Sequence, residues 1–534
     1  MTAATAEKKG VLERWLARRV RLACFACVAI FLWGVAQFYS PATGFTSLIS
    51  IGDALNGRKV AALEAVPHYV YDSSDGYDGA YYVQLALNPA LDNPELKRAI
   101  DNIPYRARRI LFCWVAWALG LGQPAWVVQA HALLNVLCWL ALAWVLLRWF
   151  PPTDGENFLR WFGVMFSSGV CMSVRNSLVD GPSLLLVALA MAALERGRRG
   201  PAVAVLALAG LGKETSLLAV TGLADADWRA PRTWRRLAGT AALAGLPLAA
   251  WLAYVYWKFG PTNDSGLRNF TLPLSGLAGK WGETLADLAI HARSPTNLTT
   301  LATVVALTAQ FLFFALRWRP AEAWWRVGAT FAVLLVFLAH PVWTGYPGAA
   351  TRVLLPMMLA FNITVPRGRR WLPLLLVGNL TVVSAYKEFA PPREFFEMHG
   401  DRRVLAALHV ERTGGWLGLE NTPTTQWRWS SGQSGLRFRN TTGGPLALAL
   451  HGRIGSALDE RRVRAFAGEA MVWSEAVTSP PGEFRFGCIL PPGETTISFR
   501  TDQPPHHVGG DERPMAFRVL NLEIVVKPVA GKGS

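Results

Sequence analysis

Residues 195–223 read ERGRRGPAVAVLALAGLGKETSLLAVTGL. The apolar part, 201–223, is long enough to cross the ~30 Å hydrocarbon core of a membrane, but Lys213 and Glu214 interrupt it between glycines and a threonine. Arginines flank it on both sides, as is typical of cytoplasmic loops. We therefore expect a broken hairpin that enters the membrane and returns, because a single crossing would place every later arginine-rich loop outside. Such irregular backbone is tolerated in a membrane only where protein or a watery cavity surrounds it.

Further apolar segments on both sides of this hairpin predict a polytopic α-helical membrane protein. Hydrophobic residues make up 52% of the 534 residues and charged residues only 17%, which excludes an ordinary soluble protein. Much of the net charge of +16 lies in clusters between apolar segments, which indicates membrane topology and attraction to anionic lipid headgroups, not nucleic-acid binding. Besides the hairpin we predict about nine spans: 20–39, 125–147, 158–175, 181–195, 238–257, 297–316, 323–341, 351–365 and 371–387.

The same charge pattern predicts which segments face which side. The basic N-terminus has no small-residue cleavage site after its apolar run, so we interpret it as an uncleaved anchor with its end in the cytoplasm. Loops 41–123, 258–296 and 342–350 then lie outside, as does everything from about residue 390 onward. Residues 110–122 are too short for a span, and we expect a helix at the outer membrane surface.

The C-terminal region changes character. Over residues 431–534, proline and glycine separate short alternating runs, which is typical of an all-β sandwich. A Trp-rich connector, 390–430, precedes the sandwich, and residues 1–389 form the transmembrane module. Tryptophan faces stack on sugars but are also ordinary core residues, so glycan binding by this region is one of two interpretations.

The first external loop carries the sequence SDGYDGAYY at 74–82. A carboxylate within hydrogen-bond reach can take the proton of an attacking hydroxyl, and Asp78 is our candidate for that general base, with Asp75 as the second. The glycines would let the backbone approach a substrate. Three tyrosines offer faces on which sugars stack: Tyr77, Tyr81 and Tyr82. Alternatively, both aspartates only form turns beside the glycines.

Ionisable residues at the membrane supply candidate phosphate ligands. Within a membrane segment such residues are costly and by default functional, so Lys213 could bind a phosphate and Glu214 orient it, unless the two form a structural ion pair. Arg352 begins a span at the outer face, where it could stabilise charge on a departing phosphate or anchor the helix at the interface. The same argument applies to three more arginines of the first loop: Arg106, Arg108 and Arg109.

Three further residues complete the candidate substrate-binding set. Asp180 lies between two spans and either binds sugar or caps the following helix, and we favour the cap. Tyr105 precedes the arginine cluster, and Tyr346 precedes Arg352. The six cysteines form no metal-ligand or disulfide framework.

The order of these motifs resembles the GT-C superfamily of membrane glycosyltransferases. An N-terminal anchor is followed by the acidic–aromatic motif and then by YRARRIL at 105–111, which opens a short helix. More specifically, GYDGAYY at 76–82, GKET at 212–215 and TRVLLP at 351–356 resemble a bacterial branch associated with cell-surface glycopolymer formation. The resemblance covers most of residues 20–390, through short motifs and their order.

This resemblance implies an enzyme of the bacterial inner membrane with a periplasmic active site and a periplasmic C-terminal domain. It would transfer a sugar from a polyprenyl-phosphate donor to a cell-envelope glycan or glycolipid. The family carries an acidic catalytic residue in the first external loop, which Asp78 matches. Its commoner acidic pair is two adjacent carboxylates, whereas Asp75 and Asp78 are separated here, so a divalent metal (Mg²⁺ or Mn²⁺) stays an open expectation.

Two other classes of protein share some of these features. A lipid-linked glycan flippase would use Lys213 in a substrate path, but such proteins usually show related halves and small external loops. A non-catalytic polysaccharide-assembly protein would use the sandwich to recruit enzymes. The large predicted external segments, 41–123 and 390–534, disfavour the flippase.

Overall fold

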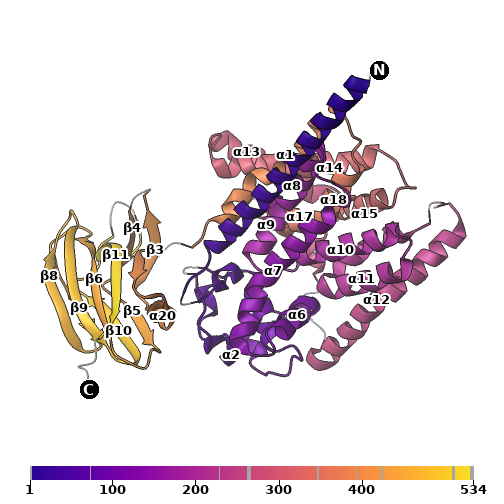
Figure 1. Cartoon of the computed structure of the whole chain (residues 1–534). Coiled ribbons are helices and arrows are strands. Elements are labelled where there is room, and N and C mark those ends of the chain that lie inside the picture. The colour runs from indigo at the N-terminus through magenta and orange to yellow at the C-terminus, as the bar shows by residue number, and fades with distance from the viewer. Residues whose placement is uncertain are drawn as a thin grey trace. The chain divides into compact units, whose positions relative to one another are not determined.

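The computed structural model describes the chain as two compact units (Figure 1). The described residues are 3–41, 43–71, 74–225, 227, 229–260, 266–345, 348–392, 394–422, 425–507 and 511–529. The helical unit comprises Met1–Gln37, Leu48–Val66 and Asp75–Ala390. The β unit comprises Phe38–Ser47, Pro67–Ser74 and Pro391–Ser534.

Within the described residues, four helices are long and apolar enough to cross a membrane. They are Trp15–Ala36 within α1 (Ala3–Ala36), α7 (Pro124–Leu146), α12 (Pro231–Phe259) and α14 (Pro295–Leu316). Three of them begin with proline, whose fixed φ suits the first helical turn, where its missing N–H would have no helical partner. These helices overlap four of the predicted spans, and the chain is a multi-pass helical membrane protein by this measure.

The other predicted spans are shorter or broken helices. Predicted span 158–175 forms α8 (Gly155–Met165) and α9 (Ser168–Arg175), and the indole Nε1 of Trp139 donates to the carbonyl of Met165 at the break (3.0 Å). A side chain of a neighbouring helix thus satisfies a carbonyl that the break frees, as an apolar environment requires. The last three predicted spans correspond to shorter helices: α15 (Ala323–Phe337), α17 (Ala350–Val353), α18 (Leu355–Thr364), α19 (Leu372–Gly378) and η6 (Leu380–Phe389).

The predicted hairpin segment is interrupted where its charged residues lie. Helix α11 (Arg199–Gly212) ends before Lys213, whose backbone is extended, and the 3₁₀ helix η3 (Glu214–Leu223) follows. Helix α10 (Asp180–Glu195) packs against α11, and α11 packs against α12 (Figure 1). Helix α11 also packs against η3. The break is confirmed, while its placement in a membrane stays a prediction.

The predicted external loops are largely helical. Residues 258–296, expected as a loop, contain α13 (Ser275–Ile290), because Leu277, Trp281 and Leu285 recur at helical spacing. In the first loop, the short helices are η1 (Thr46–Ile49), η2 (Asp53–Leu55), α2 (Ala61–Glu64), α3 (Asp78–Leu87), α4 (Leu96–Ala99), α5 (Ile103–Ala107) and α6 (Leu111–Leu119). Short helices also occur elsewhere in the described chain: η4 (Leu267–Asn269), α16 (His340–Trp343), η5 (Arg369–Trp371) and α20 (Arg402–Ala406).

The β unit is a two-sheet domain. One sheet has the order β3-β4-β11-β6-β9 with β1 parallel to β11, and the other has the order β2-β5-β10-β7-β8. The strands are β1 (Phe396–His399), β2 (Leu408–Arg412), β3 (Trp416–Asn421), β4 (Gln426–Ser430), β5 (Gln433–Asn440), β6 (Leu446–Ser456), β7 (Arg461–Ala467), β8 (Ala470–Val477), β9 (Gly482–Leu490), β10 (Gly493–Arg500) and β11 (Phe517–Pro528). Residues 390–430, predicted as a connector, therefore contribute β1 to β4.

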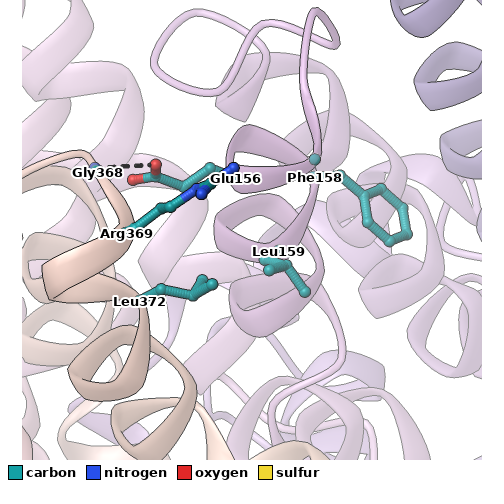
Figure 2. A pocket seen from close by; sticks show the side chains of 7 residues that line it. Glu156, Phe158, Leu159, Gly368, Arg369 and Leu372 are labelled. Atoms are coloured by element: carbon teal, nitrogen blue, oxygen red, sulfur yellow. Dashed lines mark hydrogen bonds between the residues drawn. The ribbon is translucent and has the colours of Figure 1, made fainter.

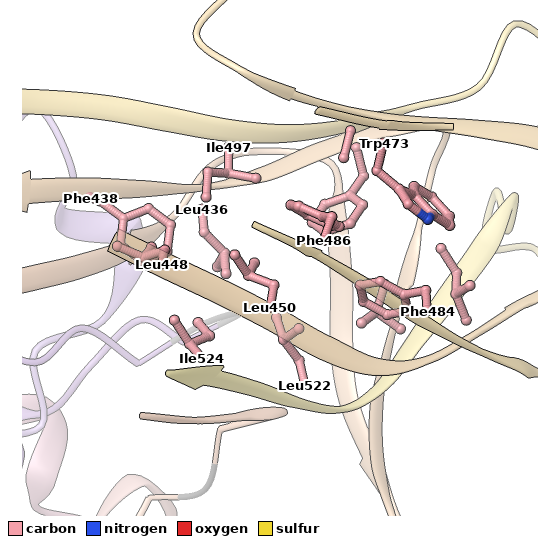
Figure 3. Close-up of a cluster of buried hydrophobic side chains, with 14 of the residues drawn as sticks. Leu436, Phe438, Leu448, Leu450, Trp473, Phe484, Phe486, Ile497, Leu522 and Ile524 are labelled. Atoms are coloured by element: carbon pink, nitrogen blue, oxygen red, sulfur yellow. The ribbon is translucent and has the colours of Figure 1, made fainter. Parts of the chain in front are cut away.

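Alternating side chains of the two sheets form one core (Figure 3). Figure 3 shows Leu436 and Phe438 of β5 together with Leu448 and Leu450 of β6, each pair two residues apart. A period of two is what places alternate residues of a strand on one face. The predicted two-sheet β architecture at the C-terminus is confirmed.

Candidate functional site

The acidic motif forms the start of α3, and its glycines are required by packing. Gly76 has a φ of +74°, and a Cβ there would lie 2.7 Å from the backbone nitrogen of Gly52. A Cβ on Gly79 would lie 2.1 Å from the carbonyl oxygen of Asn176, at the end of α9. The structure thus gives both glycines a packing reason: the backbone that approaches them belongs to the protein itself.

Asp78 is the first residue of α3 and is clamped by Arg106. Arg106 Nη1 donates to Asp78 Oδ1 at 2.6 Å, while the Asp78 side chain keeps 29% of its surface exposed. Arg106 also binds both oxygens of Asp101, from Nε at 3.0 Å and from Nη2 at 2.8 Å. Asn102 caps α5 by accepting from the N–H of Tyr105, which places Arg106 on the first turns of that helix.

The carboxylates keep this guanidinium charged. Burial alone would lower the pKa of Arg106, but the hydrogen bond to Asp101 and the charge of Asp78 raise it above its ordinary value. Burial opposes ionisation of Asp101 as well, yet Arg106 brings the pKa of that carboxyl below its ordinary value. Asp101 was not among the residues predicted from the sequence.

A second arginine cluster surrounds Glu214. Arg109 binds its carboxylate with Nε at 2.8 Å and Nη2 at 2.7 Å, and Arg108 Nη2 lies 3.3 Å from Oε1. Arg109 also donates to the hydroxyl of Tyr82 at 3.2 Å, and the Arg108 guanidinium lies over the ring of Tyr105, 4.0 Å from its centroid. A planar, bidentate fork of this kind specifies orientation as well as charge.

The third cluster is a buried triad around Asp180. Lys213 Nζ donates to Oδ1 at 2.5 Å and Arg352 Nη1 to Oδ2 at 3.0 Å. Side-chain exposures are 4% for Asp180, 8% for Lys213 and 9% for Arg352. The cap predicted for Asp180 is wrong: Val179 occupies the N-cap of α10, with no side-chain cap bond, because the carboxylate is used by the two cations.

This triad is closed to large ligands. The cavity beside Asp180, Lys213 and Arg352 measures about 10 Å³, room for the centre of about one water molecule. Arg352 Nη2 donates to the hydroxyl of Tyr77 at 2.9 Å, and Tyr77 precedes Asp78. Because Lys213 and Arg352 donate to the same carboxylate, Lys213 fixes the position of Asp180 and, through Asp180, that of Arg352.

The three clusters belong to one polar region of the helical unit. Arg109 interacts electrostatically with both Asp180 and Lys213, and Asp78 interacts electrostatically with Arg352. The contributing segments are α3, α5 and its C-terminal end, the start of α10, the break before η3, and α17. The predicted aspartate and lysine motifs thus lie in the same region.

Three predicted residues remain, and they differ in their relation to these clusters. Asp75 is exposed and makes no ion pair or hydrogen bond with the described part of the chain. Tyr81 is half-buried, and the Arg106 guanidinium lies 4.7 Å from its ring centroid. Tyr346 lies outside the described residues.

The acidic groups do not fit a divalent metal. No cluster of three or more His, Cys, Asp or Glu side chains suited to a metal ion occurs within the described segments. Asp78 and Asp101 both face the guanidinium of Arg106, so a bound cation would lie against a fixed positive charge.

Sequence reasoning also missed a carboxylate near the end of η6. Glu388 is half-buried and interacts electrostatically with Arg175 and Arg352. Arg175 Nη1 donates to the hydroxyl of Ser50 at 2.8 Å, which in turn donates to Asn176 Oδ1 at 2.8 Å. The sequence signal that could have identified Glu388 is a Lys–Glu pair at the end of a predicted span. Charged residues at that position are also ordinary interface anchors, so the signal is not specific.

Comparison with known proteins adds little to this geometry. No protein-family model matches the chain, and no curated protein matches it significantly. Among solved structures, a cryo-EM structure of arabinosyltransferase EmbB from Mycobacterium smegmatis aligns over 93% of this chain and 64% of that chain, with 11% identity and a TM-score of 0.28. The chain thus spans less than two thirds of that protein. A similarity this weak establishes neither a common fold nor an activity.

Proposed function

We propose that the protein is a membrane glycosyltransferase of the GT-C type. It would transfer a sugar from a polyprenyl-phosphate donor to a cell-envelope glycan or glycolipid acceptor on the periplasmic face. The observation that carries the proposal is the partly exposed carboxylate of Asp78 within a region of half-buried and buried arginines and tyrosines. The order of motifs along the chain supports the same class.

In the proposed reaction, Asp78 is the general base. Arg106 engages Oδ1, so Oδ2 can accept the proton of the acceptor hydroxyl. The hydroxyl oxygen then bonds to the anomeric carbon, the bond from that carbon to the carrier phosphate breaks, and the electron pair leaves with the polyprenyl phosphate. The proton stays on Asp78 until it passes to solvent.

The arginines supply the charge that this step needs. Negative charge grows on the departing phosphate, and fixed cations in a poorly hydrated site stabilise it most effectively. Arg106 and Arg108 keep part of their surface accessible, at 12% and 18% of the side chain, and they are our proposed phosphate ligands. Arg352 is more deeply buried, and we propose that it acts through Tyr77, beside the base.

Release of the carrier tests this proposal. Purified full-length protein in lipid nanodiscs would be incubated with a panel of polyprenyl-phosphate sugars and membrane-derived acceptor, and free polyprenyl phosphate would be measured. We expect Asp78→Asn to lower the rate about 10²-fold or more. Glu64→Gln, an exposed carboxylate of the same loop, serves as the matched control and should retain full activity.

Each result separates the alternatives. Normal turnover by Asp78→Asn would remove the base assignment. No release from any donor by wild-type protein would favour a flippase or an assembly protein. A further variant, Asp75→Asn, reports whether the second, exposed aspartate of the motif takes part.

A further inference from the structure

A groove lies between the first turn of α8 and the turn that leads into α19, apart from the three ionic clusters (Figure 2). It encloses about 410 Å³. Its lining residues are Gly155, Glu156, Phe158 and Leu159 of α8 with Gly368, Arg369 and Leu372 of the facing turn. Both segments adjoin loops that the charge pattern predicts to be cytoplasmic.

The body of the groove is apolar. The Leu159 side chain comes from one wall and the Leu372 side chain from the other, while the Phe158 ring points away from the facing turn, and the two glycines contribute no side chain. Leu159 and Leu372 each keep part of their side-chain surface uncovered. Apolar surface of this kind is stabilised when a hydrocarbon chain covers it.

The acidic residue at the rim is already neutralised. Glu156 accepts from Arg160 Nη2 at 2.6 Å and from the backbone N–H of Gly368 at 3.1 Å, the contact drawn in Figure 2. Arg160 is buried, with 2% exposure, and also donates to the carbonyl of Val365 at 2.9 Å. These bonds join the two walls, so the groove is built by the fold and not by a loose surface contact.

The cation at the rim is free. Arg367 donates to Asn157 Oδ1 at 3.0 Å, and the Arg370 guanidinium lies 5.6 Å from the Trp371 ring centroid. Arg369, in contrast, is exposed and has no carboxylate, carbonyl or ring partner in the described part of the chain. An unpaired guanidinium beside an apolar groove is complementary to a phosphate that carries a hydrocarbon chain.

We propose that this groove binds an anionic phospholipid, with an acyl chain against Leu159 and Leu372 and the phosphate against Arg369. A membrane protein meets such lipids at high local concentration, and basic pockets between membrane helices bind their headgroups. A free phosphate would leave the apolar walls uncovered, and a zwitterionic lipid would place a second cation beside Arg369 and its neighbouring arginines.

Native mass spectrometry of the full-length protein in a neutral detergent tests the proposal. Phosphatidylglycerol and phosphatidylcholine of equal chain length would be supplied in equal amounts. Wild-type protein should retain phosphatidylglycerol at least fivefold over phosphatidylcholine, and Arg369→Gln should reduce that preference to about one. Leu159→Trp, which narrows the groove, should lower retention of both lipids.

The control is Arg235→Gln, an exposed arginine near the start of α12 without a partner in the described residues. It loses the same charge but should keep the wild-type preference. If Arg369→Gln and Arg235→Gln lose the preference for phosphatidylglycerol to the same extent, the attraction is one of diffuse charge, and the proposed site is overturned. Equal retention of the two lipids by wild-type protein, or full displacement of phosphatidylglycerol by glycerol phosphate, which has no acyl chain, would also overturn it.

Discussion

The triad around Asp180 contains two cations and one anion in the interior of the helical unit. Asp180 therefore neutralises only one of Lys213 and Arg352, although it accepts a hydrogen bond from both. Removing one partner of a buried ion pair is costly because it leaves an uncompensated charge away from water. The two ends of the triad should therefore respond differently to substitution.

We expect Asp180→Asn to destabilise the protein by about 3–5 kcal/mol, because two cations lose their counter-charge. Lys213→Met should cost far less, since it leaves a neutral Asp180–Arg352 pair. Unfolding of each variant by denaturing detergent measures the difference. If Lys213→Met instead keeps wild-type stability but abolishes sugar transfer, Lys213 is a substrate ligand and not a structural partner.

The stability that Asp101 contributes through its ion pair with Arg106 should depend on pH. Its folded-state pKa lies below the ordinary value, so its contribution to stability is complete above the unfolded pKa of about 3.9 and is lost as pH falls through the folded pKa. Because the Asp101 side chain is 45% exposed, that contribution should stay below about 1 kcal/mol. Asp101→Asn should therefore flatten the decline of the unfolding midpoint below pH 4, and parallel profiles for the two proteins would contradict the assignment.

At the scale of elements, the start of α3 depends on close contact with the end of α9. Tyr77 N–H donates to the carbonyl of Ser50 at 2.9 Å, and Gly79 approaches the backbone of Ile49 and Asn176. Neither neighbour is a flexible side chain that could move aside. The position of Asp78 is therefore a consequence of how two helix ends and one loop pack.

Gly79→Ala should disturb this packing. The added Cβ would lie 2.1 Å from one carbonyl oxygen and 2.9 Å from another, so we expect a loss of about 1–3 kcal/mol together with most of the transfer activity. Gly239→Ala in α12 is the matched control, because a Cβ there meets nothing within 4 Å, and helix propensity should stabilise it by up to about 1 kcal/mol. Similar thermal unfolding of the two variants would contradict the packing role of Gly79.

At the scale of the whole molecule, the predicted membrane orientation rests on the charge pattern alone and is open to a direct test. In a cysteine-free background, Asp75→Cys, Glu475→Cys and Arg369→Cys introduce thiols at three exposed positions. A membrane-impermeant maleimide should label the first two in intact spheroplasts and the third only after permeabilisation, because arginine-rich loops stay in the cytoplasm. Labelling of all three without permeabilisation would refute the predicted topology.

The sequence by itself determined the long helices, the interruption at Lys213 and the two-sheet character of the C-terminus. Each of these follows from local patterns: the length of an apolar run, charge within it, or alternation with period two. These local patterns did not predict the strands in residues 396–430. Strand β1, for example, is defined by its pairing with β11, more than a hundred residues later.

Only the tertiary structure decided which charges meet. Asp180 lies 33 residues from Lys213 and 172 from Arg352 along the chain, and Asp78 lies 28 residues from Arg106. An ion pair depends on distance in space and on desolvation, and no local pattern encodes either. For the same reason Asp180 looked like a helix cap in the sequence, whereas in the fold its carboxylate serves the two cations that packing brings to it.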